Sequence, residues 1–286
     1  MKPTDATNWL ARESNIASYL KECANEAARP DGPDRQFRHG PALGDITENR
    51  PPEWVDHFWQ PVCHTWQDRS ALLAAMARMD AAFPPPRQTI VEDMTFGAAT
   101  IAYAFHLSTI RWVLGGLPDG LRIAEIGGGY GGLASLVQGV CCPKSYTIFD
   151  IEEPSRLQRS FLRALDFQTD MFRWPALGDA PDDRFDVAFS IAALSELNRA
   201  TRDTYVAGVL AKADYGLVQW SCGPQGASPE WLCQPAEISQ WFSTILPGKK
   251  IVHAEVFPGR GAPDAECEAN RKLFGPFGQW LWHWRP

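Results

Sequence analysis

The spacing of apolar residues changes near Pro118. Before that residue, apolar side chains recur at helical spacing in three stretches, which we expect to be helices: Trp9–Ala28, Ser70–Met79 and Ala98–Leu114. Segments rich in proline and glycine separate these stretches, among them the sequence FPPPRQ. The pattern therefore predicts a helical N-terminal region, residues 1–117.

After Pro118, short apolar runs alternate with helical stretches. We expect strands at residues 121–126, 145–150, 185–190 and 215–220. We expect helices at Gly132–Val140, Glu153–Leu165, Thr201–Ala213 and Pro235–Leu246. This alternation is typical of a mostly parallel sheet covered by helices on both faces. The sequence thus predicts a Rossmann-like α/β domain at residues 118–286, with the N-terminal region as a helical cap. Two last apolar runs, residues 250–257 and 279–284, are expected to pair antiparallel at the sheet edge.

The sequence AEIGGGYGGLASL, residues 124–136, follows the first expected strand and opens the next helix. A glycine-rich turn at such a place brings backbone N–H groups and a helix N-terminus beside a ligand. Gly127, Gly129 and Gly132 fit the pattern G-x-G-x-x-G, which alone is compatible with a dinucleotide, a nucleotide or no ligand. The same stretch fits E-x-G-x-G-x-G, which begins at Glu125.

Two acidic residues bear on the choice of ligand. A carboxylate at Glu125 would repel the pyrophosphate of a dinucleotide, but it would attract the sulfonium and ammonium groups of S-adenosylmethionine. Asp150 ends the second expected strand, where a carboxylate can accept both ribose hydroxyls of a cofactor. Because Asp150 suits NAD as well, an NAD-dependent oxidoreductase remains the alternative.

Three segments and one tyrosine resemble a family of sugar O-methyltransferases within the class I S-adenosylmethionine-dependent methyltransferases. They are IAEIGGGYGGLA, YTIFDIEEPSRLQRSFL, FDVAFSIAALSEL and Tyr205. The resemblance covers about a third of the chain, residues 121–220. It implies a sheet of seven strands whose last strand is inserted antiparallel. It also implies methyl transfer from S-adenosylmethionine to an oxygen of a sugar or of a glycosylated or small natural product, with S-adenosylhomocysteine as the other product.

The residues expected to bind this cofactor come from the glycine turn and from the ends of the strands. Tyr130 either packs on the methionine arm of the cofactor or only fixes the turn. Asp170 and Met171 are placed after a weakly marked third strand, close to the adenine. The full set is Glu125, Gly127, Gly128, Gly129, Tyr130, Gly131, Asp150, Ile151, Asp170, Met171 and Ser190.

Two residues are candidates for acid–base catalysis at the acceptor oxygen. Glu196 follows the fourth strand and could orient an acceptor hydroxyl, take its proton or help to hold a metal; it could equally brace the helix near Asn198. His106 has a side chain suited to a general base, although it could be a core histidine. Tryptophans of the N-terminal region, Trp54, Trp59 and Trp66, are candidates for contact with the acceptor.

Composition narrows the remaining function classes. The net charge is −7 and no Lys/Arg-rich run occurs, so nucleic-acid binding is not expected. No apolar run has the length of a membrane span, and the first residues lack a signal-peptide core, so we expect a cytoplasmic protein. The seven cysteines show no C-x-x-C spacing and are interpreted as free thiols. Dependence on a metal, assembly into a homo-oligomer, and loss of catalysis in a pseudo-methyltransferase are left open.

Overall fold

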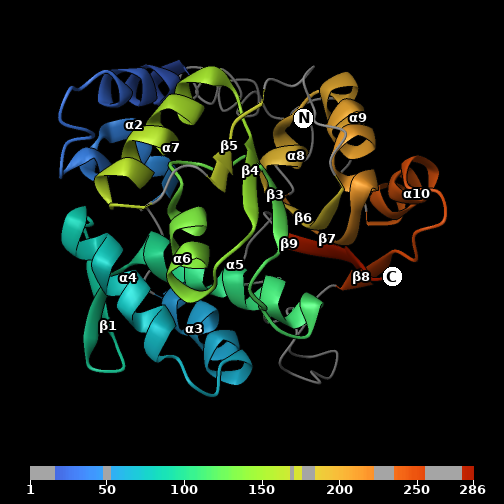
Figure 1. The fold of residues 1–286 in the computed structure, drawn as a ribbon, viewed down its shortest axis with the longest axis horizontal. Coiled ribbons are helices and arrows are strands. Elements are labelled where there is room, and N and C mark those ends of the chain that lie inside the picture. Colours follow the sequence, from blue (N-terminus) through green and yellow to red (C-terminus); the bar gives the residue numbers. More distant parts are fainter. Residues whose placement is uncertain (1–16, 48–52, 168–170, 176–183, 222–234, 255–278) are drawn as a thin grey trace, which may run out of the picture.

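The computed structural model describes residues 17–47, 53–167, 171–175, 184–221, 235–254 and 279–286 of the 286-residue chain. A seven-stranded sheet lies at its centre, in the order β5-β4-β3-β6-β7-β9-β8 (Figure 1). Its strands are β3 (Arg122–Ile126), β4 (Ser145–Phe149), β5 (Phe172–Arg173), β6 (Phe185–Ile191), β7 (Ala213–Ser221), β8 (Val252–Ala254) and β9 (Gln279–Trp284).

The direction of the strands confirms the fold predicted from the sequence. Five strands run parallel to one another, in the order β5, β4, β3, β6 and β7. β9 lies between β7 and β8 and runs antiparallel to both. The sheet is therefore Rossmann-like and mostly parallel, with an inserted antiparallel strand. In this register Ile126 pairs with Phe149 on one side and with Ser190 on the other. The residues that follow these strands therefore come side by side at one edge of the sheet.

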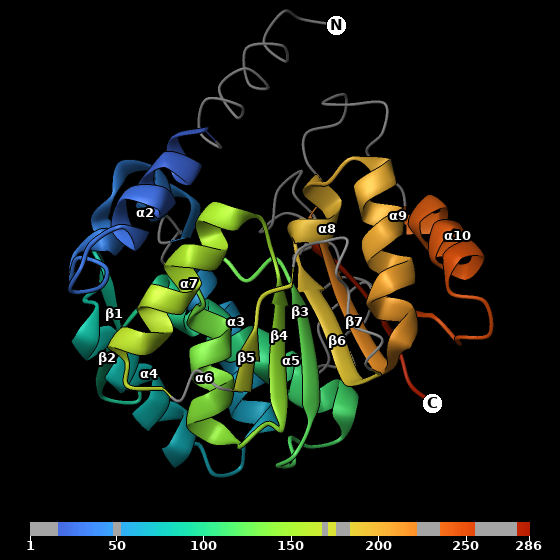
Figure 2. The same ribbon diagram turned by 45° about the horizontal axis from the view of Figure 1, so that its top comes forward.

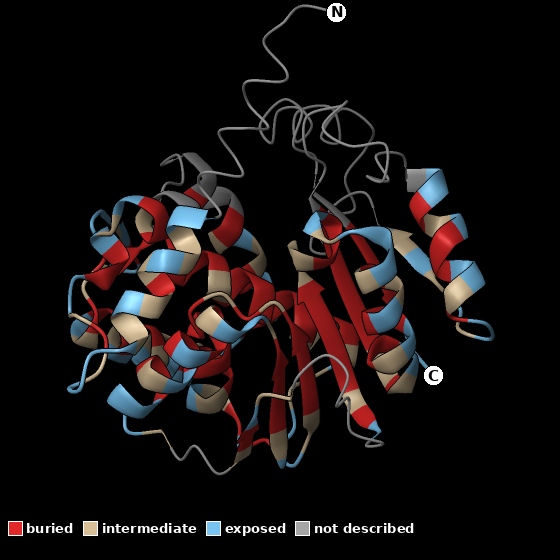
Figure 3. Ribbon diagram, turned by 90° about the horizontal axis from the view of Figure 1, so that it is seen from above, coloured by how far each residue is buried: buried red, intermediate tan, exposed pale blue. Residues whose placement is uncertain are grey.

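Helices cover both faces of the sheet (Figure 2). One face carries α6 (Gly132–Val140) and α7 (Glu152–Ala164), and the other carries α9 (Arg199–Gly208) and α10 (Pro235–Ile245). Successive residues of β3 point to opposite faces, so Ile123 joins the first layer and Ala124 the second. The central strands are accordingly buried along much of their length (Figure 3).

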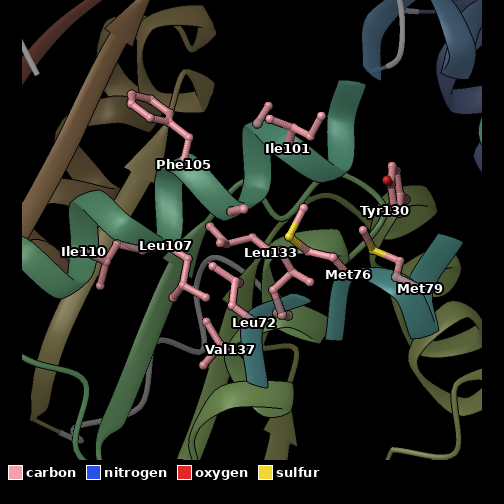
Figure 4. Close-up of a cluster of buried hydrophobic side chains, with 14 of the residues drawn as sticks. Leu72, Met76, Met79, Ile101, Phe105, Leu107, Ile110, Tyr130, Leu133 and Val137 are labelled. Atoms are coloured by element: carbon pink, nitrogen blue, oxygen red, sulfur yellow. The ribbon is translucent and has the colours of Figure 1, made fainter. Parts of the chain in front are cut away.

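The N-terminal elements pack on the same face as α6. They are a helix at residues 17–27, η1 (Phe37–His39), α2 (Pro41–Thr47), α3 (Glu53–Thr65), α4 (Ser70–Ala82), the hairpin β1 (Gln88–Val91) and β2 (Met94–Gly97), and α5 (Ala98–Leu114). Figure 4 shows apolar side chains of α4, α5 and α6 pointing toward one another. One buried cluster thus runs from the N-terminal elements to the sheet, and the boundary at residue 117 stays a prediction.

A buried ion pair holds several N-terminal segments together. Arg38 Nη1 of η1 lies 2.5 Å from Asp80 Oδ1 of α4, and both side chains are almost fully buried. Arg38 also donates to the Phe83 carbonyl and to Thr100 Oγ1 of α5. Asp80 Oδ2 accepts from the Gly97 N–H at 2.7 Å, which ties in the end of the hairpin.

Most element bounds agree with the sequence prediction, whereas α3 and α9 differ from it. No helix was predicted at residues 53–65, which form α3 because Val55, Phe58 and Val62 bury one side of it in spite of Pro61. The helix expected to run to Ala213 ends at Gly208, where a short η4 (Leu210–Lys212) follows and β7 begins. Much of the first expected helix, the stretch before residue 17, lies outside the described residues.

Trp282 and Trp284 of the antiparallel strand β9 lie on one face of the sheet, as residues two apart in a strand do. Trp282 and Trp284 are fully buried against the layer of α9 and α10, and Trp282 Nε1 donates to Ser239 Oγ of α10 at 2.9 Å. Gly216 of β7 pairs with Trp284, and a Cβ at Gly216 would lie 1.8 Å from the indole ring. The absence of a side chain at Gly216 is therefore what admits the ring.

No helix among the described residues is long and apolar enough to cross a membrane.

Candidate functional site

The glycine turn, Gly127–Gly131, follows β3 at the edge where the parallel strands end. Gly127, Gly129 and Gly131 have positive φ angles of 78°, 55° and 98°, a region that favours glycine. The turn is closed by a hydrogen bond from the Gly131 N–H to the Gly128 carbonyl, 2.9 Å long, and α6 starts at the next residue. This is the strand–turn–helix arrangement that the motif predicts.

Side chains of the protein itself approach the turn closely. A Cβ at Gly127 would lie 2.1 Å from the Ala193 Cβ, and one at Gly132 would lie 2.2 Å from the Tyr103 ring. A Cβ at Gly128 would meet the Ile148 side chain at 2.7 Å. Several glycines are therefore required by packing within the chain, in addition to any ligand.

Asp150 follows β4 and directs its carboxylate at the turn. Its Oδ2 accepts from the Gly128 N–H at 3.0 Å and from Gln158 Nε2 at 2.8 Å, and its Oδ1 accepts from the Ile151 N–H at 2.9 Å. Burial raises the pKa of Asp150 to about 6, although these hydrogen bonds to the ionised form oppose the shift. A carboxylate oxygen accepts about two hydrogen bonds, so the capacity left for a ribose hydroxyl lies on Oδ1.

Gln158 of α7 is a site residue that the sequence analysis missed. Its Nε2 donates to the Gly129 carbonyl at 2.9 Å as well as to Asp150, and its Oε1 accepts from Trp174 Nε1 at 3.0 Å. The side chain is fully buried. A signal was available, because Gln158 lies one helical turn from Phe161 and Pro154 and so occupies the apolar side of α7.

Glu125 differs from the expected cofactor-binding carboxylate. It is buried, and its Oε2 accepts from the Tyr146 hydroxyl of β4 at 2.8 Å. Burial raises the pKa of Glu125 to about 8, against the opposing effect of the Tyr146 hydrogen bond. The raised pKa favours the protonated form and so weakens the charge attraction predicted for Glu125, whose contact with the cofactor stays a prediction.

The side chain of Tyr130 is buried within the protein. Its ring makes edge contacts with Phe37, Tyr103 and Phe161, at centroid distances of 5.1–5.5 Å. Of the two interpretations of Tyr130, this packing supports the one in which it fixes the turn. Ile151 has the opposite character: its side chain is 51% exposed directly after Asp150. An apolar side chain held open at this edge is consistent with the predicted contact to the cofactor.

The position expected for Asp170 and Met171 was wrong in one respect. The third strand of the fold is β5, Phe172–Arg173, so Met171 precedes that strand instead of following it, and Asp170 lies outside the described residues. The prediction failed because a two-residue strand leaves almost no hydrophobic pattern. Trp174 takes the place after the strand, with its indole bonded to Gln158.

Ser190 is the second-last residue of β6, beside the turn, and is fully buried. Its Oγ donates to the Ile126 carbonyl at 3.1 Å and accepts from the Leu194 N–H at 3.2 Å. Ser190 therefore joins β3 to the loop after β6, and its contact with a cofactor stays a prediction. In that loop Ala192 has a φ of 65°, a conformation that non-glycine residues seldom adopt.

The two candidate catalytic residues lie in different surroundings. Glu196 ends α8 (Ala193–Glu196), the short helix after β6, and is exposed. Asn198 caps α9 by accepting from the Thr201 N–H at 3.0 Å, as a helix cap does. His106 is buried on α5 against the rings of Phe58 and Phe105, which is the packing of a core histidine. The roles of Glu196 and His106 in catalysis stay predictions.

Two tryptophans of the N-terminal region, which were candidates for contact with the acceptor, lie in or against the core. Trp66 is buried, and its Nε1 donates to Ser108 Oγ of α5 at 2.9 Å, so its role is in the core. Trp59 is partly buried against the same cluster.

Within the described ranges, no group of three or more His, Cys, Asp or Glu side chains is arranged to hold a metal ion. Tyr205 packs in the core against Phe149.

Comparisons with known proteins bear on the fold. No protein-family model matches the chain, and no curated protein gives a significant match. The crystal structure of the 4+2 cyclase SpnF matches with a TM-score of 0.50 and 14% identity, over 76% of this chain and 93% of that one. At this identity the likeness concerns the fold.

Two structures that contain SAH match with lower TM-scores. Magnesium protoporphyrin IX methyltransferase from Synechocystis PCC 6803, with bound SAH, has a TM-score of 0.44 and 12% identity, over 85% of this chain and all of that one. The DhpI–SAH complex has a TM-score of 0.43 and 13% identity, over 80% of this chain and 96% of that one. Because SpnF is a cyclase, a shared fold does not define the reaction, which depends on the residues of the site.

Proposed function

We propose that this chain is an S-adenosylmethionine-dependent methyltransferase. The observation that carries the proposal is the joining of the glycine turn to the end of β4, where the Gly128 N–H donates to Asp150. This contact lies at the carboxyl edge of a sheet whose fifth parallel strand is followed by an antiparallel insertion. A fixed acid beside a glycine turn at that edge suits a nucleoside whose ribose hydroxyls need an acceptor.

Two features of the structure favour S-adenosylmethionine over NAD. The open sheet of dinucleotide-binding folds is built from two parallel halves, whereas this sheet inserts β9 antiparallel. In addition, the N–H groups of Gly127, Gly128 and Gly131 already donate to acceptors within the chain. They are thereby withdrawn from the anion cradle that a pyrophosphate requires.

The proposed reaction moves the methyl group to an oxygen of a small acceptor, and the resemblance favours a sugar or a glycosylated natural product. The bound cofactor supplies an electrophilic methyl group on a sulfonium. The acceptor oxygen then needs to lose its proton, and Glu196 is the described acid after β6 that is exposed to receive it. His106 is the weaker candidate because it is enclosed by aromatic rings.

Calorimetry with the full chain tests the choice of cofactor. We expect S-adenosylhomocysteine to bind and NAD to give no heat. We also expect Asp150→Asn to weaken the binding of S-adenosylhomocysteine by about tenfold or more, because the loss of a charge-assisted hydrogen bond costs about 1.4 kcal/mol or more. Binding of NAD without binding of S-adenosylhomocysteine would establish the oxidoreductase alternative.

Transfer of a labelled methyl group to a panel of glycosylated acceptors tests the reaction. For Glu196→Gln we expect turnover to fall about 100-fold or more while the affinity for S-adenosylhomocysteine is kept, because a general base acts on the chemical step. His106→Ala is the matched comparison, and a chelator tests for a metal. Binding of the cofactor without transfer to any acceptor would favour a pseudo-methyltransferase.

A further inference from the structure

Gln158 stands at the junction of three segments that come from different parts of the chain. Its Nε2 reaches the Gly129 carbonyl after β3 and Asp150 after β4, at 2.9 Å and 2.8 Å. Its Oε1 takes the indole N–H of Trp174 after β5, at 3.0 Å. One side chain on α7 thus contacts the ends of three neighbouring strands.

The chemistry of the partners fixes the orientation of the Gln158 amide. The indole N–H can only donate, whereas the Gly129 carbonyl and the Asp150 carboxylate accept. Exchanging Nε2 and Oε1 would therefore oppose oxygen to oxygen twice and nitrogen to nitrogen once. Because the side chain is fully buried, water cannot repair such an arrangement, and a single geometry results.

Neighbouring groups further fix the positions of the Gln158 and Trp174 side chains. A Cβ at Gly128 would lie 3.0 Å from Gln158 Nε2, so the amide lies directly against the turn. The Trp174 ring makes two more contacts. The Arg159 guanidinium lies 5.0 Å from its centre, and Phe172 stacks on it with a centroid distance of 5.8 Å.

We propose that Gln158 is a positioning residue that sets the cofactor site of this enzyme by holding the glycine turn, Asp150 and Trp174 in one arrangement. The inference rests on the proposed function, because it concerns the site for S-adenosylmethionine. Because Gln158 occupies Oδ2 of Asp150, the remaining acceptor capacity lies on Oδ1, which also accepts from the Ile151 N–H. Its role is thus to act through Asp150 and not to touch the reacting atoms.

Two substitutions separate positioning from mere packing. Gln158→Leu removes all three hydrogen bonds, and we expect the affinity for S-adenosylhomocysteine to fall about tenfold or more. It also removes a hydrogen bond to ionised Asp150, so the pH below which binding weakens should move upward from about 6. Gln158→Glu keeps the shape but adds a second carboxyl, so binding should weaken as the pH rises from 6 to 8, opposite to the wild type.

Controls identify the origin of each effect. Gln240→Glu makes the same chemical change on an exposed position of α10 and should leave both affinity and pH profile unchanged. Trp174→Phe removes a single hydrogen bond and should give a smaller loss than Gln158→Leu. Thermal unfolding of each variant shows whether it is folded. If Gln158→Leu does not fold, Gln158→Glu tests the proposal in its place.

A measurement without ligand separates failure of this inference from failure of the proposed function. The Asp150 carboxyl carbon is titrated by NMR in the wild type and in Gln158→Leu, where we expect a higher pKa in the variant. If the wild type binds S-adenosylhomocysteine while the variants match it in affinity, pH profile and titration, Gln158 does not position the site. If the wild type fails to bind it but the titration moves, the cofactor assignment is wrong and the positioning of Asp150 by Gln158 stands.

Discussion

The proton on Glu125 couples the stability of the fold to pH. Tyr146 donates to this buried carboxyl group, and burial raises its pKa to about 8 from an ordinary value of 4.5. Between these two pH values the folded state holds a proton that the unfolded chain has released. The contribution of Glu125 to stability is therefore fully present below the lower value and declines as the pH rises toward 8.

Replacing Glu125 by glutamine should remove this dependence. We expect the melting temperature of the wild type to fall between pH 6 and pH 8 more than that of Glu125→Gln, with a slope of at most about 1.4 kcal/mol per pH unit from this group. Tyr146→Phe should extend the decline to higher pH, because the tyrosine hydrogen bond lowers the pKa of Glu125. If the melting temperatures of wild type and Glu125→Gln change with pH in the same way, Glu125 is ionised at neutral pH.

The pairing of β7 with β9 depends on the missing side chain at Gly216. Alanine there would place its Cβ within 2 Å of the Trp284 ring, so the strands must shift or the indole must leave its place. We expect Gly216→Ala to cost about 1–3 kcal/mol in the free energy of unfolding, measured by denaturant titration. Gly116→Ala is the control, since a Cβ at Gly116 has no atom within 4 Å.

A second substitution tests the cause. With Trp284→Leu in the background, Gly216→Ala should cost clearly less, because the ring that it meets is gone. Equal costs in the two backgrounds would mean that the conformational freedom of Gly216, and not its contact with Trp284, is what the fold requires.

Elements with a strong periodic pattern were predicted from the sequence, and the rest depended on packing. α5, α6 and β9 have the expected bounds because their apolar residues fit a single period. α3 was not predicted, although Val55, Phe58 and Val62 share one side of it, because Pro61 lies inside the segment. The helix forms because tertiary burial of that side outweighs the missing N–H of one proline.

Only part of the candidate site was predicted from the sequence, because the rest depends on contacts between distant segments. Asp150 and the glycines follow from their places after strands, which a linear pattern reveals. Gln158 and Trp174 are brought to the site by α7 and by a two-residue strand, and their hydrogen bonds join segments distant in sequence. The raised pKa of Glu125 could not be predicted either, because it results from burial between strands.

The buried pair of Arg38 and Asp80 connects η1, α4, the hairpin and α5 into one body. Removing one partner leaves a charge without its counterion in the interior, so we expect Asp80→Ala to cost about 3–5 kcal/mol in the free energy of unfolding. The double change Arg38→Ala with Asp80→Ala should cost less than the sum of the single changes. Thermal and denaturant unfolding of the four proteins measures this coupling.

An exposed ion pair provides the control. Arg29 and Glu26 lie 3.2 Å apart, but the arginine side chain is 47% exposed, so Arg29→Ala should change the free energy of unfolding by less than about 1 kcal/mol. A cost for Asp80→Ala as small as that for Arg29→Ala would mean that the N-terminal segments hold together without the buried pair.

The order in which the chain is made has a consequence for the sheet. β8 precedes β9 in the sequence, yet in the part of the chain that the structure describes β8 pairs with β9 alone. During synthesis β8 is therefore made before its partner strand, and among the described strands it has no backbone hydrogen bonds to the sheet until β9 is in place. The sheet is completed when β9 enters between β7 and β8, so the open edge of β7 is a place where a chaperone or a second nascent chain could pair first.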